Sequence, residues 1–166
     1  GNFAYQASVG DFNGFRIFRI ADPYNPSLMD SIATHHKAED VAIRNNWLYV
    51  ADTEGGLSAW DISQPLQPIE RGRIIPSDTS PKGMIRGVVL DGAHAYVTGY
   101  RPSLRIIDVS DPLQMIDVAQ VEWGGIIGGS NGRRIAVSNG RAYLADYQLI
   151  TAFDVRQPQT VEQLGY

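Results

Sequence analysis

Cysteine is absent from the 166 residues, which excludes disulfide bonds and thiol chemistry. Positive charge is also scarce, because 14 Lys and Arg stand against 18 Asp and Glu, for a formal net charge of -4. This balance leaves no basic stripe, so nucleic acid is not an expected partner. No apolar run approaches the roughly 18 residues that would cross a bilayer, so no transmembrane segment is expected.

Short apolar runs separated by glycine and proline make up most of what the sequence does contain. The 17 glycines and 9 prolines lie between runs rich in valine, isoleucine, leucine and aromatic residues, which is the pattern of many short strands. With 43% hydrophobic and 19% charged residues, the chain has enough apolar material for a packed domain. We therefore expect a globular all-β protein.

A repeat of 42 to 47 residues runs through this pattern, and such a period indicates the architecture before any strand is assigned. Four segments align without gaps: residues 15–23 (FRIFRIADP), 57–65 (LSAWDISQP), 104–112 (LRIIDVSDP) and 150–158 (ITAFDVRQP). A second block precedes three of them, at residues 41–52, 88–99 and 135–146, with a tyrosine at the same position in each. Each unit reads as four strands, which is the content of a propeller blade.

The second unit predicts strands at about residues 41–43, 47–52, 57–62 and 67–75. Its third strand carries bulk on both faces, as expected for a sheet pressed between two neighbours. The fold class is therefore an all-β propeller of four-stranded antiparallel blades, about 3.75 of them in this chain. The blades cover approximately residues 1–37, 38–83, 84–131 and 132–166, and the first lacks its inner strand.

The incomplete first blade raises the question of how the propeller closes. The chain could form a four-bladed ring with one defective blade, half of a larger ring completed by a second copy, or part of a longer chain. A fragment of a larger ring is the favoured interpretation, since a start inside a blade is unusual for a domain. Further blades, from the same longer chain or from a second copy, are thus expected partners.

The repeated strand resembles the LVIVD-repeat family of bacterial and archaeal β-propellers. The resemblance rests on residues 104–112 (LRIIDVSDP), preceded by Ala-Tyr-Val at residues 95–97, and it covers nearly the whole chain. Arg19 departs from the pattern, because the other copies have aspartate there. The resemblance implies an exported or cell-surface propeller, in a family whose members mostly have no assigned activity. Composition alone leaves the compartment open.

Length variation between the units concentrates in the fourth strand and the loop after it, so a binding site is expected on the face that carries these loops. The first such loop contains His35, His36, Glu39 and Asp40, whose side chains are of the types that bind zinc or a similar divalent metal. Adjacent histidines diverge, however, and the spacing fits no standard metal motif. A solvated surface loop without any cofactor is the favoured alternative.

Charged and aromatic residues mark other positions on the same face. Arg86 and Arg134 align with Glu39 and Asp40 at the mouth of the central channel, where they could pair across blades or grip an anionic or polar ligand. Tyr100, Arg101 and Trp123 are further candidates, because aromatic residues and arginine are what interfaces use. The repeated aspartates Asp61, Asp108 and Asp154 are instead interpreted as scaffold that accepts hydrogen bonds from a turn or from a neighbouring strand.

The sequence therefore favours a non-catalytic propeller that presents one loop face to a protein or glycan partner, since no nucleophile–base set appears. The alternative is a metal-dependent binder or an enzyme with its site at the channel mouth, and the pattern leaves the question of enzymatic activity open.

Overall fold

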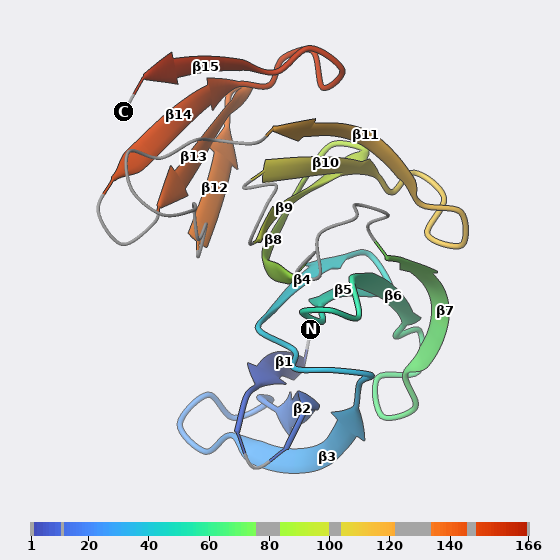
Figure 1. The fold of residues 1–166 in the computed structure, drawn as a ribbon. Coiled ribbons are helices and arrows are strands. Elements are labelled where there is room, and N and C mark those ends of the chain that lie inside the picture. Colours follow the sequence, from blue (N-terminus) through green and yellow to red (C-terminus); the bar gives the residue numbers. More distant parts are fainter. Residues whose placement is uncertain are drawn as a thin grey trace.

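Four antiparallel sheets follow one another along an arc (Figure 1). The computed structural model describes residues 2–10, 12–75, 84–99, 104–121, 134–145 and 149–165. The first sheet contains β1 (Phe3–Ser8), β2 (Gly14–Arg19) and β3 (Ser27–Ala33), and the second contains β4 (Asp40–Arg44), β5 (Trp47–Ala51), β6 (Leu57–Asp61) and β7 (Ile69–Ile74). The third contains β8 (Ile85–Asp91), β9 (His94–Gly99), β10 (Leu104–Asp108) and β11 (Ile116–Val121), and the fourth contains β12 (Arg134–Ser138), β13 (Arg141–Ala145), β14 (Ile150–Asp154) and β15 (Glu162–Gly165).

This architecture confirms the all-β fold of antiparallel blades that the repeat predicts. Consecutive strands are hydrogen-bonded neighbours in every sheet, and the inner strand β8 packs beside the inner strands β4 and β12. Within the described residues the first sheet has three strands, with β1 at the edge where the other sheets carry an inner strand. No helix that could span a membrane occurs in the described ranges.

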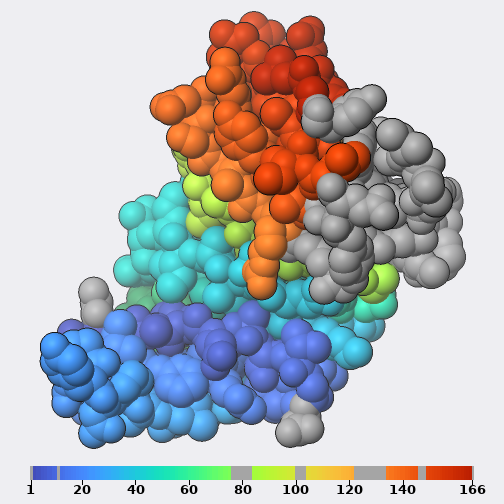
Figure 2. Space-filling view, turned by 90° about the vertical axis from the view of Figure 1, so that its left-hand side faces the viewer, coloured from blue at the N-terminus to red at the C-terminus, as the bar shows by residue number. Residues whose placement is uncertain are grey.

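Apolar side chains between consecutive sheets form the hydrophobic core. Leu57 of β6 and Ile107 of β10 pack in the contact between the second and third sheets. On the opposite face of β6, Trp60 packs against Phe15 of the first sheet, with their ring planes 81° apart. Figure 2 shows the sheets as successive layers, from the first (blue) to the fourth (orange and red) at the other end. Burial on both faces explains why these strands lack a polar side.

A bulge recurs at one position of the pairing between the third and fourth strands of each sheet. The register shifts between Ile17 and Phe18, Ala59 and Trp60, Ile106 and Ile107, and Ala152 and Phe153. A bulge inserts one extra residue in one strand, bends that strand and increases its twist. Because the four bulges are equivalent, the four sheets share a curvature that allows them to stack.

The four aligned prolines occupy equivalent turns between the third and fourth strands. In each turn a backbone amide donates to the carbonyl oxygen three residues earlier: Asn25 to Asp22, Gln67 to Gln64, Gln114 to Asp111 and Thr160 to Gln157, at 2.9 to 3.2 Å. The proline stands at the second position, where its fixed φ of about -65° matches a β-turn. The proline spacing therefore reports the spacing of the turns.

The three repeated aspartates close the third strand in a common way. Asp61, Asp108 and Asp154 each accept a hydrogen bond from the backbone amide two residues later, at 2.9, 2.8 and 3.0 Å. The amide of Ser110 thereby holds the pKa of the Asp108 carboxyl below its ordinary value. Of the two scaffold roles that the sequence leaves open, these contacts show the turn role.

Tyrosine hydroxyl groups connect the first sheet to the second and the second sheet to the third. Tyr5 donates to the carbonyl oxygen of Pro65 at 3.2 Å, and Tyr49 donates to that of Val109 at 3.4 Å. The Val109 carbonyl also accepts a hydrogen bond from Arg44 at 3.0 Å. Burial raises the pKa of the Tyr49 hydroxyl, so the group stays protonated and able to donate. The tyrosines of the repeat are thus part of the contact between sheets.

Replacing Tyr49 with phenylalanine should remove its hydrogen bond and keep the ring in place. Because Val109 retains its bond from Arg44, we expect the free energy of unfolding to fall by only about 1 kcal/mol in urea titrations. Tyr24→Phe is the matched control, since Tyr24 is 97% exposed and its replacement should leave stability unchanged. Equal stability of Tyr49→Phe and the wild type would show that the inter-sheet hydroxyl contributes nothing.

Acid should weaken the fold through the turn aspartates. A carboxyl whose pKa is lower in the folded than in the unfolded state stabilises the fold above the unfolded pKa of about 3.9, and loses that effect as the pH falls through the folded pKa. Asp108→Asn keeps an acceptor oxygen but does not titrate. Its free energy of unfolding, measured in urea from about pH 5 downward, should therefore depend less steeply on pH than that of the wild type. Identical slopes would argue against the assigned role.

Candidate functional site

Two loops meet at one end of the second sheet and form the candidate site. The connection between β3 and β4 passes over the turn between β5 and β6, and the backbone amides of His35 and His36 donate to the Asp52 carboxylate at 3.1 and 3.0 Å. The amide of Lys37 donates to the Thr53 hydroxyl at 3.3 Å. β3 corresponds to the fourth strand of a complete blade, and β5 is the second strand of its sheet. The loop after a fourth strand and the loop after a second strand therefore lie on one face.

A buried ion pair lies beneath this contact. Asp52 is fully buried, and its carboxylate lies 3.2 Å from the guanidinium of Arg73 on β7. Arg73 also donates two hydrogen bonds to the carboxylate of Glu70, at 2.7 and 3.0 Å, and another to the carbonyl oxygen of Gly55. A two-pronged arginine–carboxylate contact is among the strongest polar contacts in proteins. The network fixes β7, the β5–β6 turn and the β3–β4 connection together.

The β5–β6 turn folds tightly around the Asp52 carboxylate because its two glycines allow a close approach of the backbone. Gly56 has a φ of +78°, and a Cβ there would lie 2.1 Å from the carbonyl oxygen of Ile74. A Cβ at Gly55 would lie 2.5 Å from a carboxylate oxygen of Asp52. Larger residues at these two positions would displace the turn from the network.

The histidine side chains point away from this fixed backbone, each toward a carboxylate. His35 Nε2 lies 3.6 Å from Glu70 Oε2, and His36 Nδ1 lies 3.7 Å from Glu54 Oε2. A hydrogen bond from its own backbone amide and one from the Thr53 hydroxyl hold the pKa of the Glu54 carboxyl below its ordinary value. The loop thus presents imidazole and carboxylate groups side by side at the surface.

The other two members of the predicted metal set lie elsewhere. The Asp40 carboxylate accepts hydrogen bonds from the amides of Val41 and Val88, at 3.0 and 3.1 Å, so it joins the inner strands of two sheets. Glu39 lies 3.9 Å from Arg86 Nε. Each member of the predicted set therefore has its own partner. Among the described residues, no group of three or more His, Asp or Glu side chains is arranged to hold a metal ion.

The predicted arginines differ in their surroundings. Arg86 lies where the register between β8 and β9 shifts, its side chain is 17% exposed, and it pairs with Glu39 of the preceding sheet. This is the pairing across blades that the aligned charges suggest. Arg134 begins β12 and is exposed. Tyr100, Arg101 and Trp123 lie outside the described residues.

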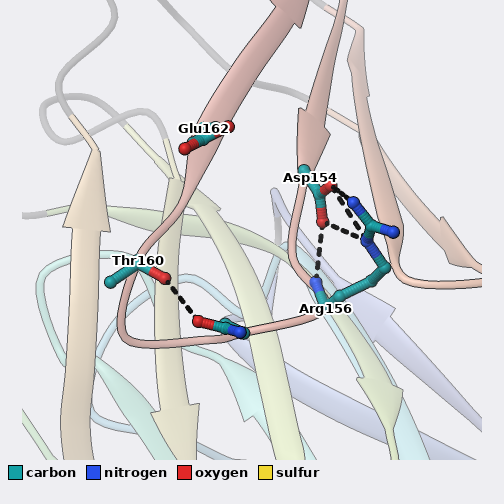
Figure 3. A pocket seen from close by; sticks show the side chains of 5 residues that line it. Asp154, Arg156, Thr160 and Glu162 are labelled. Carbon is teal, nitrogen blue, oxygen red and sulfur yellow. Dashed lines mark hydrogen bonds and ion pairs between the residues drawn. The ribbon is translucent and has the colours of Figure 1, made fainter.

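A polar pocket lies at the end of the fourth sheet where β14 turns into β15 (Figure 3). It has a volume of about 470 Å³ and is lined by Asp154, Arg156, Gln157, Thr160 and Glu162. Arg156 forms an ion pair with Asp154, and the Thr160 hydroxyl donates to Gln157 at 3.3 Å. Sequence reasoning missed this pocket. The residues that could have indicated it are Arg156 and Glu162, because the second and third units have a serine and an isoleucine at the equivalent positions.

The Asp52 network was also missed, because its members do not recur together in the repeat. Asp52 was visible only as the last residue of an aligned block in which the third unit has Gly99. Arg73 and Glu70 lie on a fourth strand, and the third unit has Gln120 in place of Arg73. The charge of Arg73 at a position where the third unit has Gln120 was the one sequence signal that could have pointed to the network.

The LVIVD repeat describes most of the chain. The model of this repeat matches residues 1–34, 36–75 and 82–122. No curated protein matches the chain in sequence.

Solved structures with similar folds come from several organisms. One is a protein from Lactobacillus plantarum, with 16% identity and a TM-score of 0.75, aligned over 99% of this chain and 52% of its own. A functionally unknown protein from Desulfotomaculum acetoxidans is 16% identical with a TM-score of 0.75, aligned over 99% of this chain and 53% of its own. The β-propeller domain of Cps50 (Swd1) from Myceliophteria thermophila is 12% identical with a TM-score of 0.64, aligned over 99% of this chain and 54% of its own. The likeness shows the propeller fold, and the chain spans about half the length of each of these proteins.

Replacing Asp52 with alanine should release the β3–β4 connection. The change leaves the Arg73 guanidinium without its buried partner and the amides of His35 and His36 without an acceptor. We expect the free energy of unfolding to fall by about 3 kcal/mol, the low end for a broken buried pair because Arg73 keeps Glu70. Hydrogen exchange at the two histidine amides should also accelerate. The matched control is Asp91→Ala at an exposed position, and slow exchange in the Asp52 variant would contradict the role.

Proposed function

Because the chain belongs to the LVIVD-repeat family, we propose that it is a non-catalytic β-propeller module that binds a protein or glycan partner through one loop face. The contact face consists of the β3–β4 connection and the β5–β6 turn. The proposal includes an exported or cell-surface location, which rests on the family resemblance alone.

The observation that carries the proposal is a fixed backbone with exposed side chains. Asp52 and Thr53 hold the backbone of the β3–β4 connection, while the side chains of His35 and His36 are 65% and 49% exposed. The Glu54 side chain beside them is 50% exposed. Such a surface loses little conformational entropy when a partner binds, because its backbone is already ordered. Imidazole and carboxylate groups offer hydrogen bonds to peptide groups and to sugar hydroxyls alike.

The roles of the recurring residues support a binding module over an enzyme. The repeated prolines and aspartates form turns, and two of the repeated tyrosines bond to the next sheet. What remains distinctive lies in loops, which is where binding residues concentrate on a rigid scaffold.

The loop face can be tested by comparing two histidine variants. Purified wild type, the double variant His35→Ala/His36→Ala and the control His94→Ala are probed with a glycan array and with extracted surface proteins. His94 begins β9 at the opposite end of its sheet, opposite Asp108 in the register. For each glycan or purified protein that binds, we expect the Kd to rise about tenfold or more in the double variant and to stay unchanged in the control. Binding that survives in the double variant and is lost in the control would refute the assignment.

A metal-dependent binder at this loop is the second candidate. The pairs His35–Glu70 and His36–Glu54 favour it, because imidazole and carboxylate are the ligand types of zinc. The same titrations are therefore repeated in chelator and with added zinc. Equal binding in both supports the metal-free module, whereas binding that requires zinc supports the alternative.

A further inference from the structure

The turn between β14 and β15 carries two charges that the equivalent turns of the second and third sheets lack. Arg156 and Glu162 stand where both of those units have serine and isoleucine, whereas the aspartate at position 154 is shared. The other two turns form the same backbone hydrogen bond without these charges. The equivalent positions of the second sheet, residues 63, 64, 67 and 69, are exposed although the third sheet follows it. The openness of this turn therefore does not depend on its place in the chain.

The Arg156 side chain is held at two points, although it is 75% exposed. Its Nε donates to both carboxylate oxygens of Asp154 at 3.0 Å, and its Nη2 donates to the same carboxylate. Its stem lies against the turn between β12 and β13, where a Cβ at Gly140 would overlap Arg156 Cγ. The second and third units have Asn46 and Ala93 at this position. The glycine and the arginine of the fourth unit thus fit each other, and the guanidinium is in place before a ligand binds.

The pocket beside this guanidinium presents donors and acceptors together. Figure 3 shows Thr160 and Glu162 across the pocket from Asp154 and Arg156. Within the described ranges, no hydrogen bond engages Arg156 Nη1 or the Glu162 carboxylate. The Thr160 hydroxyl donates to Gln157, so its oxygen can still accept. The pocket therefore has an unused donor on one side and unused acceptors on the other.

The composition of the lining argues against other classes of ligand. Two carboxylates and one guanidinium give a net charge of -1, and Arg156 is already paired with Asp154, so an anion is disfavoured. An apolar ligand would meet only polar side chains, which it would desolvate without compensation. The described residues arrange no group of three metal-binding side chains here. A cation would meet the exposed Glu162, and exposed ion pairs contribute little.

We propose that this pocket binds a neutral saccharide unit. Each sugar hydroxyl both donates and accepts hydrogen bonds, which matches a guanidinium donor facing carboxylate and hydroxyl acceptors. Hydroxyl groups accept from Arg156 Nη1 and donate to Glu162, and both bonds involve a charged partner, which strengthens them. A neutral ligand also leaves the pair of Arg156 and Asp154 intact. The volume of about 470 Å³ lies within the range of about 300–1,000 Å³ of small-molecule pockets.

Titration of the isotope-labelled chain with neutral sugars, followed by NMR, tests the pocket. The panel contains D-glucose, D-galactose, D-mannose and N-acetyl-D-glucosamine, with putrescine and inorganic phosphate as charged probes. We expect at least one sugar to shift the Nε–H signal of Arg156 and the backbone amide of Gln157, with a Kd of about 1 mM. If no sugar shifts these signals at up to about 50 mM, or if only a charged probe does, the proposal is wrong.

Two pocket variants then locate the binding. Arg156→Ser/Glu162→Ile gives the turn the residues of the second and third units, so the turn should still form. Gly140→Asn keeps all the lining residues but displaces the arginine stem, and asparagine tolerates the φ of +70°. We expect the Kd for the sugar to rise about tenfold or more in both variants. Arg71→Ser is the matched control, because Arg71 is exposed on β7, and it should bind as the wild type does.

Circular dichroism and thermal unfolding verify that the variants fold. Unchanged affinity in either pocket variant would overturn the proposal.

The pocket lies at the opposite end of the sheets from the loop face, because the β14–β15 turn is equivalent to the β6–β7 turn. It shares no residue with that face and does not rest on the function proposed above. The double variant His35→Ala/His36→Ala should therefore bind the sugar as the wild type does. Sugar binding that is lost there and kept in Arg156→Ser/Glu162→Ile would belong to the loop face and refute the pocket.

Discussion

Apolar packing between consecutive sheets is the interaction on which the rest of this structure depends. A strand such as β6 is covered on both sides, by Phe15 of one neighbour and by Ile107 of the other. Burial of apolar surface stabilises by about 25 cal/mol per Å², so a sheet that is covered twice gains far more than a sheet with one wet face. No sheet here has its own core. Each is stable because another sheet lies against it, which is the thermodynamics of repeat proteins.

The polar residues of the repeat serve that packing. Equivalent bulges give the sheets a common twist. Equivalent turns, formed with proline and aspartate, connect the third strand of a sheet to its fourth. The hydroxyl of Tyr49 then satisfies a carbonyl of the next sheet within an otherwise apolar contact. Because these groups are engaged in the scaffold, the loops at the other end of the sheets can differ from unit to unit.

The sequence was informative wherever a physical requirement recurs. Proline positions predicted the turns, because the proline recurs four times. The doubled bulk of residues 57–62, which recurs at residues 104–109, predicted a sheet between two neighbours. Contacts that occur once could not be predicted in this way. Asp52, Glu70 and Arg73 are separated by up to 21 residues, and each is a residue type that is usually solvated. Only the fold shows that a glycine turn brings Asp52 under the amides of His35 and His36.

The predicted metal set shows why shared sequence neighbourhood is a weak guide to a site. His35, His36, Glu39 and Asp40 lie within six residues, yet the connection bends at the two histidines and their side chains have different partners. Asp40 is taken by an amide of the next inner strand, and Glu39 by Arg86, so the carboxylates serve the contact between sheets. The histidine side chains lie beside Glu70 and Glu54 and remain largely exposed to solvent. Repetition thus assigns most polar groups to the scaffold, and the side chains that the scaffold does not use are the ones available to a partner.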